Sequence, residues 1–156
     1  MVDVISHSRD IEASPEAVFP RVIDIDGLPS WNAKIQEVVS RPGSVAEGAQ
    51  WTVRVKANGS KWTSSSEVVE LDRTERRFVH RSKRDGKNPS YALWTWTVEP
   101  SSAGAKLTVT CELHPKTFFL KHVLLPVRKG PLRKEMQASL DELSELVRAE
   151  QASDTT

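Results

Sequence analysis

The chain has 156 residues, of which 38% are hydrophobic and 28% are charged. This length and composition indicate one globular domain and exclude a collagen-like, disulfide-dense or disordered chain. Lysine and arginine number 22 against 21 aspartate and glutamate residues, so the net charge of +1 gives no overall attraction to DNA or to an anionic membrane. We expect a single domain over residues 1–150 and a disordered tail over residues 151–156.

Cysteine usage and the N-terminal residues bear on the compartment. A single cysteine, Cys111, cannot form an internal disulfide bond, which favours a reducing environment. The first residues lack the charged and apolar regions of a signal peptide. No uncharged apolar stretch approaches the roughly 20 residues that a membrane-spanning helix needs. We therefore expect a cytoplasmic protein.

The predicted elements begin with a strand over residues 2–11. The Ser-Pro-Glu motif at residues 14–16 is a helix start, because it supplies a capping hydroxyl, a proline at the first helical position and an early carboxylate. Apolar residues continue with helical spacing over residues 18–23. The Asp-Gly-Leu-Pro sequence at residues 26–29 ends this helix, and a second short helical turn carries Trp31. We expect two short helices after the first strand.

Between residues 35 and 114 the pattern changes to alternation of apolar and polar residues, with turn signals between the runs. Short connections between about six such strands predict an antiparallel meander with one buried face. Alternate residues of each run share one face of their strand, as in Trp51, Val53 and Val55, in Phe78, His80 and Ser82, in Trp94, Trp96 and Val98, and in Leu107, Val109, Cys111 and Leu113.

A long amphipathic helix is predicted near the C-terminus. Leu132, Met136, Leu140, Leu143 and Val147 recur at steps of three or four residues. A sheet with one apolar face needs a cover, and a helix of this length can cross a sheet. The fold class is therefore α+β.

This order of elements and five motifs resemble the SRPBCC superfamily, which includes START-like domains, polyketide cyclases and allergens of the birch-pollen type. The resemblance implies a helix-grip fold, in which a curved antiparallel β-sheet of about seven strands wraps around the long C-terminal helix and encloses a largely apolar cavity. Members bind lipids, sterols or polyketides, some catalyse cyclisation, and others are protein adaptors. The motifs are Ile11–Phe19, Asp24–Trp31, Glu70–Phe78, Trp96–Pro100 and Leu140–Leu143.

Tryptophan dominates the aromatic content, with five residues against one tyrosine and four phenylalanines. Trp31, Trp51, Trp62, Trp94 and Trp96 either pack in the core or line a cavity for a hydrophobic ligand. In the family the tryptophan that ends the Leu-Pro-x-Trp turn stands near the cavity mouth, so the resemblance makes Trp31 the first candidate. Trp51 and Trp62 fall on adjacent strands, where we expect their rings to stack.

Ser64 and Ser66 share one face of the strand that carries Trp62. If this face is the inner one, their hydroxyls lie beside the indole and can bind a ligand; the alternative is an outer, solvated face. Aromatase/cyclase members of the family place an arginine near this point of the strand, where this chain has Val68. The resemblance therefore favours ligand binding over a cyclase activity.

His80 is the best general-base candidate by residue type, because the unperturbed pKa of histidine lies near neutrality. The alternative is a histidine that is hydrogen-bonded in the core or faces solvent. The four histidines lack the spacing of a metal site, and no phosphate-binding loop is present, so we expect no metal and no cofactor. The candidate ligand-binding residues are Trp31, Trp51, Trp62, Ser64, Ser66, Phe78, His80, Trp94 and Trp96.

Residues 113–134 hold six lysine or arginine residues and no acid, interleaved with phenylalanine, leucine and valine. One interpretation is a loop that forms a lid over the cavity, and prolines at positions 115, 126 and 131 argue against one continuous helix. The other is a surface that contacts an anionic membrane, RNA or a protein. Its candidate contact residues are Lys116, Lys121, Arg128 and Lys129.

Two functions follow from these patterns. The first is binding of a hydrophobic small molecule in an internal cavity, polyketide cyclase/dehydrase-like by resemblance. If the protein is an enzyme, the resemblance implies a cyclase, aromatase or dehydrase. The alternative is a regulatory or toxin-like interaction module that acts through residues 113–134.

Overall fold

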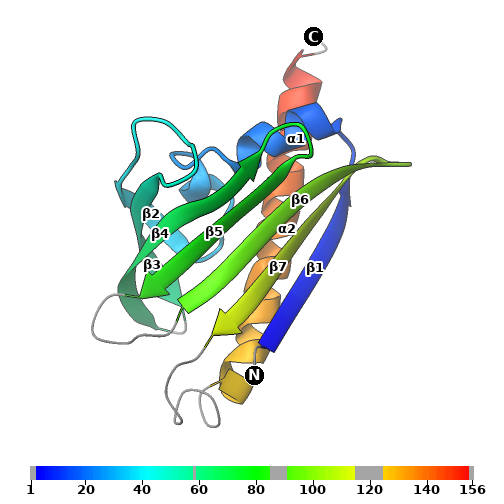
Figure 1. The fold of residues 1–156 in the computed structure, drawn as a ribbon. Coiled ribbons are helices and arrows are strands. Elements are labelled where there is room, and N and C mark those ends of the chain that lie inside the picture. Colours follow the sequence, from blue (N-terminus) through cyan, green and yellow to red (C-terminus); the bar gives the residue numbers. More distant parts are fainter. Residues whose placement is uncertain (1–2, 58, 85–90, 115–124, 155–156) are drawn as a thin grey trace.

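The computed structural model describes residues 3–57, 59–84, 91–114 and 125–154. Within these ranges the chain forms seven strands, two α-helices and one 3-10 turn (Figure 1). In chain order they are β1 (Asp3–Ile11), α1 (Pro15–Val22), η1 (Leu28–Ser30), β2 (Ile35–Ser40), β3 (Gln50–Ala57), β4 (Ser60–Asp72), β5 (Arg77–Arg84), β6 (Tyr91–Ser101), β7 (Gly104–His114) and α2 (Leu125–Asp154).

The seven strands form one antiparallel sheet in the order β1-β7-β6-β5-β4-β3-β2. Strands β2 to β7 follow one another as a meander, and β1 pairs with β7 along its whole length, from Asp3 opposite Leu113 to Ile11 opposite Ala105. Figure 1 shows α2 crossing one face of the curved sheet, with α1 near the C-terminal end of α2. The predicted α+β helix-grip fold is confirmed.

The two short helices predicted after the first strand are present, the second as a single 3-10 turn. Helix α1 begins as its motif predicts, because the Ser14 hydroxyl accepts a hydrogen bond from the backbone N–H of Ala17 at 3.2 Å. Val18, Phe19 and Val22 of α1 are buried. The turn η1 then ends at Trp31, which it delivers to the interior.

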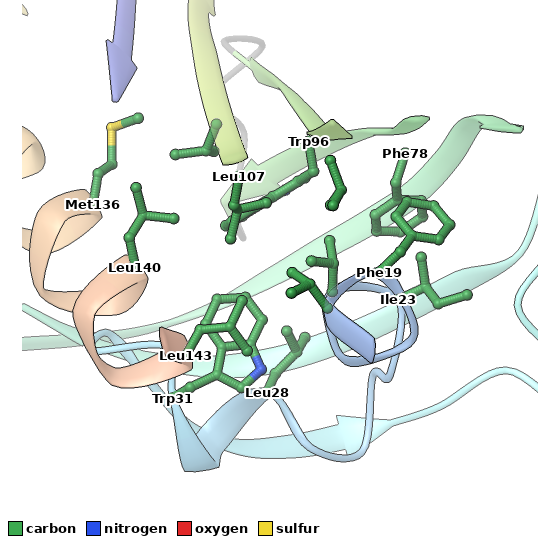
Figure 2. Close-up of a cluster of buried hydrophobic side chains, with 14 of the residues drawn as sticks. Phe19, Ile23, Leu28, Trp31, Phe78, Trp96, Leu107, Met136, Leu140 and Leu143 are labelled. Carbon is green, nitrogen blue, oxygen red and sulfur yellow. The ribbon is translucent and has the colours of Figure 1, made fainter. Parts of the chain in front are cut away.

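The predicted apolar stripe of the C-terminal helix faces the sheet. Its five residues are at most 7% exposed, and they belong to the same buried cluster as Leu107 and Val109 of β7. Figure 2 shows Met136 and Leu140 pointing from α2 toward the sheet. Burial of a side chain of this size stabilises a fold by about 1.5–3 kcal/mol, so the stripe is the main attachment of α2.

Helix α2 extends beyond the predicted apolar stripe at both ends. It begins at Leu125 and includes Pro126 and Pro131, so the prediction of a loop is wrong from residue 125 onward. A proline in the first turn of a helix removes an N–H that has no partner there, which is why Pro126 does not prevent helix formation. The helix also continues to Asp154, so the prediction of a disordered tail is wrong for residues 151–154.

The structure describes only part of the basic, apolar segment over residues 113–134. Leu113 and His114 end β7, and residues 115–124, with Lys116 and Lys121, are outside the described ranges. The side chains of Arg128 and Lys129 are also outside them. In the described residues, no helix combines the length and the hydropathy that crossing a membrane requires.

The attachment of α2 can be tested with a charge in the stripe. We expect Met136→Asp and Leu140→Asp each to lower the free energy of unfolding by several kcal/mol, because an unpaired carboxylate would be buried against the sheet. Gln137→Asp is the matched control, since Gln137 lies on the exposed side of the same turn. Urea denaturation measures all three. Equal stability of the buried and exposed variants would contradict this packing.

Candidate functional site

A cavity of about 220 Å³ lies between the inner face of the sheet, the first half of α2 and the segment from α1 to β2. Strands β3, β4, β5 and β6 form its long wall, and the helix covers the opposite side. Most of the side chains around it are apolar or aromatic. All nine residues that the sequence singles out lie on its wall, namely Trp31, Trp51, Trp62, Ser64, Ser66, Phe78, His80, Trp94 and Trp96.

Aromatic rings form a continuous row along this wall. Register explains the row, because Phe78 pairs with Trp96 and His80 pairs with Trp94 across β5 and β6, and alternate residues share a face. Trp94 lies parallel to both neighbours, with ring centroids 6.3 Å from His80 and 6.5 Å from Trp96. Trp51 of β3 extends the row, 6.1 Å from Phe78 and 5.2 Å from His80.

The stacking predicted between Trp51 and Trp62 is wrong. Trp51 lies opposite Ser66 in the β3–β4 register, whereas Trp62 lies opposite Val55. The two indoles are therefore four residues apart along the strands, about 13 Å at the rise of a β-strand. They contribute to separate parts of the cavity wall.

Trp31 belongs to the core and to the cavity wall at once. It is 2% exposed, and its ring meets Trp96 edge to face with 5.5 Å between centroids. The Trp31 Nε1 atom is buried and has no hydrogen-bond partner among the described residues. Replacement of this residue would therefore disturb packing as well as the cavity.

Three serine hydroxyls of the sheet interrupt the apolar wall, and Ser139 of α2 also lines the cavity. Ser64 and Ser66 lie on the inner face of β4, while Ser65 between them is exposed on the other side. Ser82 of β5 pairs with Ser66 in register and also lines the cavity. Its hydroxyl accepts a hydrogen bond from Trp94 Nε1 at 3.0 Å. Ser82 was not among the predicted site residues, although it shares a face with Phe78 and His80.

His80 is placed as a neutral hydrogen-bond acceptor. Its Nε2 atom accepts a hydrogen bond from Trp96 Nε1 at 3.1 Å, so the ring proton is on Nδ1. The Nδ1 atom is buried without a partner among the described residues. Burial lowers the pKa of His80 to about 3 from 6.5. Such a histidine is uncharged at neutral pH, and its one nitrogen lone pair already accepts the hydrogen bond from Trp96. A general base needs that lone pair to take a proton, so this arrangement does not suit one.

The cavity wall also contains an ion pair that the sequence pattern does not predict. Lys34 Nζ lies 3.2 Å from Glu135 Oε2 and 5.5 Å from the centroid of the Trp94 ring. Both charged residues line the cavity. Close by, the Ser139 hydroxyl accepts a hydrogen bond from the backbone N–H of Ala33 at 3.0 Å. The partners are about a hundred positions apart and each resembles a surface charge, so no local pattern indicates the pair.

A curved antiparallel sheet around a long helix, with an apolar cavity between them, defines a helix-grip protein of the type that binds hydrophobic ligands. The family described as polyketide cyclase / dehydrase and lipid transport matches residues 3–148. The chain therefore belongs to this family, within the SRPBCC superfamily that its motifs resemble. The comparison with curated proteins finds no match.

Solved structures share the fold over nearly the whole chain. An aromatase/cyclase from a Streptomyces species is 14% identical with a TM-score of 0.77, covering 95% of this chain and 94% of its own. A Thermus thermophilus protein is 19% identical with a TM-score of 0.74, covering 94% and 98%. Norcoclaurine synthase from Thalictrum flavum, in complex with a transition-state analogue, is 21% identical with a TM-score of 0.70, covering 97% of both chains. At these identities the likeness shows the fold alone.

The buried neutral state of His80 predicts a pH dependence of stability. Below pH 6.5 the unfolded chain gains a proton on this residue, and the folded chain does not until about pH 3, so stability falls as the pH is lowered through this window. The slope approaches about 1.4 kcal/mol per pH unit. We expect His80→Gln, which keeps an acceptor for Trp96, to lose this component. Urea denaturation from pH 7.5 to 4.5 measures both slopes, and equal slopes would refute it.

Proposed function

We propose that the protein binds a hydrophobic small molecule, of the lipid or polyketide kind, in this cavity. The observation that carries the proposal is the cavity itself, with one wall of stacked aromatic rings interrupted by hydroxyls. A cavity of roughly 150 Å³ holds benzene, so about 220 Å³ suits a compound of about two rings. Ligand pockets in proteins typically combine an apolar lining with a few polar groups, as this cavity does.

The aromatic row favours a flat ligand. Offset or edge-on contacts between aromatic rings contribute about 0.5–1.5 kcal/mol beyond the burial of apolar area. Trp62 and Trp94 are only partly buried and face the cavity, so they can contact a ligand without rearrangement. Ser64 and Ser66 provide hydroxyls that can donate to or accept from a polar substituent of the ligand.

Binding, rather than cyclisation, is the activity that these side chains support. His80 has a pKa of about 3, and Trp96 occupies its lone pair. Val68 stands where aromatase/cyclase relatives have an arginine, and it is a buried apolar residue. The described part of the cavity therefore resembles a carrier site that excludes water and orients its ligand. The four candidate contact residues of an interaction module have side chains outside the described residues and do not contribute to this proposal; they are Lys116, Lys121, Arg128 and Lys129.

Binding can be tested with an uncharged two-ring fluorescent probe, 6-propionyl-2-(dimethylamino)naphthalene. We expect the wild type to enhance the probe's emission, and we expect the probe to quench tryptophan fluorescence. Trp62→Ala should weaken binding by about 1–3 kcal/mol, because it removes a large apolar contact from the wall. Trp31→Ala should instead lower the stability of the fold by about 3–5 kcal/mol, because it leaves a cavity in the core.

Affinity and melting temperature are measured together on each variant. Val69→Ala is the matched control, since Val69 is 49% exposed on the outer side of β4. Its affinity should equal that of the wild type. If the wild type binds no probe, or if Trp62→Ala loses stability and keeps full affinity, the tryptophans are core residues and the proposal fails.

A further inference from the structure

The Lys34–Glu135 ion pair is unlike the other ion pairs of the described residues. Its two side chains are 18% and 21% exposed. Every other ion pair in the described ranges has at least one partner that is 36% exposed or more, as Arg9 and Asp141 are with 40% and 48%. This pair is the most buried, and both members line the cavity.

Stability does not account for this placement. Withdrawal of two charges from water costs several kcal/mol, and the attraction within a buried pair often only offsets that cost. The segment that carries Lys34 is also attached to α2 by another bond, from the Ala33 N–H to the Ser139 hydroxyl at 3.0 Å. Apolar residues at positions 34 and 135 would close the same wall without charge. The charges of this pair are therefore better explained by a polar group of the ligand that the cavity binds.

Toward a ligand in the cavity, the ion pair offers hydrogen-bond donors but carries no net charge. The Lys34 ammonium has three donors; it lies 3.2 Å from Glu135 and 5.5 Å from the centroid of the Trp94 ring. A carbonyl oxygen can accept from this ammonium while the ion pair stays intact. A carboxylate would face Glu135 at close range, and an amine cation would face Lys34, and the low exposure of both side chains weakens solvent screening of the repulsion.

We propose that Lys34 and Glu135 set the specificity of the cavity for neutral ring compounds that carry a carbonyl group, with Lys34 donating to the carbonyl oxygen and the pair together excluding free carboxylates and amines. This inference rests on the proposed function, because it assigns a ligand class to the same cavity. His80 agrees with it, since a neutral histidine adds no charge to the wall.

Four naphthalene compounds of similar size test the inference by titration calorimetry at pH 7. They are 2-acetylnaphthalene, 2-ethylnaphthalene, 2-naphthoate and 2-naphthylmethylammonium. We expect the wild type to bind the acetyl compound about tenfold more tightly than the ethyl compound, as one hydrogen bond to a charged group provides. The two ions should bind at least tenfold more weakly than the ethyl compound.

Single substitutions should change this order in opposite ways. Lys34→Met should abolish the preference for acetyl over ethyl and leave the ethyl compound bound as before. Glu135→Gln should leave Lys34 uncompensated, so the affinity for 2-naphthoate should rise at least tenfold. Asp141→Asn is the matched control: it removes an ion pair of 2.7 Å between β1 and α2 whose members do not line the cavity. It should preserve the wild-type order.

The outcomes separate this inference from the function on which it rests. If the ethyl compound binds but Lys34→Met weakens acetyl and ethyl equally, or if Glu135→Gln admits no more 2-naphthoate than the control, the pair is only part of the wall and the inference is overturned. The proposed function then stands. If none of the four compounds binds the wild type, both are overturned. Far-ultraviolet circular dichroism confirms that each variant is folded, and each of the two substitutions is an independent test.

Discussion

The burial of one apolar sheet face by a single helix is the constraint on which the rest of the structure depends. Seven strands spaced about 4.8 Å apart span roughly 29 Å, whereas a helix with its side chains is only about 10–12 Å across. Helix α2 lies nearest to β1, where Arg9 pairs with Asp141. It therefore leaves the inner face of β3 to β6 partly uncovered. Helix α1 and η1 fill some of this space, and the remainder is the cavity.

Two indole N–H groups of the cavity wall are satisfied by neighbouring side chains. Trp94 donates to Ser82 and Trp96 donates to His80, so two indole N–H groups are paired without water. The second bond also explains the state of the histidine. An indole can only donate, so its partner must be an unprotonated nitrogen, and burial favours that same neutral form. The wall is thus fixed in shape by short contacts between neighbouring strands before any ligand arrives.

Sequence alone predicts the inner face well and long-range pairs poorly, for a physical reason. Successive strand residues point to opposite sides, so alternation alone groups Phe78 with His80 and Trp94 with Trp96, and all four line the cavity. The interval between Trp51 and Trp62 depends on the β3–β4 register, which the pattern does not give. The contact of Lys34 with Glu135 requires the packed fold, since it joins a loop to α2 at the cavity wall.

Strands β5 and β6 are tightly packed in the core at one end and more open to the cavity at the other. On β5, Phe78 is 2% exposed, while the inward residues that follow, His80 and Ser82, are partly exposed to the cavity. Strand β6 runs antiparallel to β5, so its buried residue comes later in the strand. Val98 is 1% exposed, whereas Trp94, nearer the start of β6, is partly exposed. Substitutions at the buried end act on stability because they open a void in close packing. At the other end a residue borders the cavity and is less closely packed, so it can change without loss of the fold. Ligand choice can therefore diverge among proteins of this fold, and it must be inferred from the residues of each cavity wall.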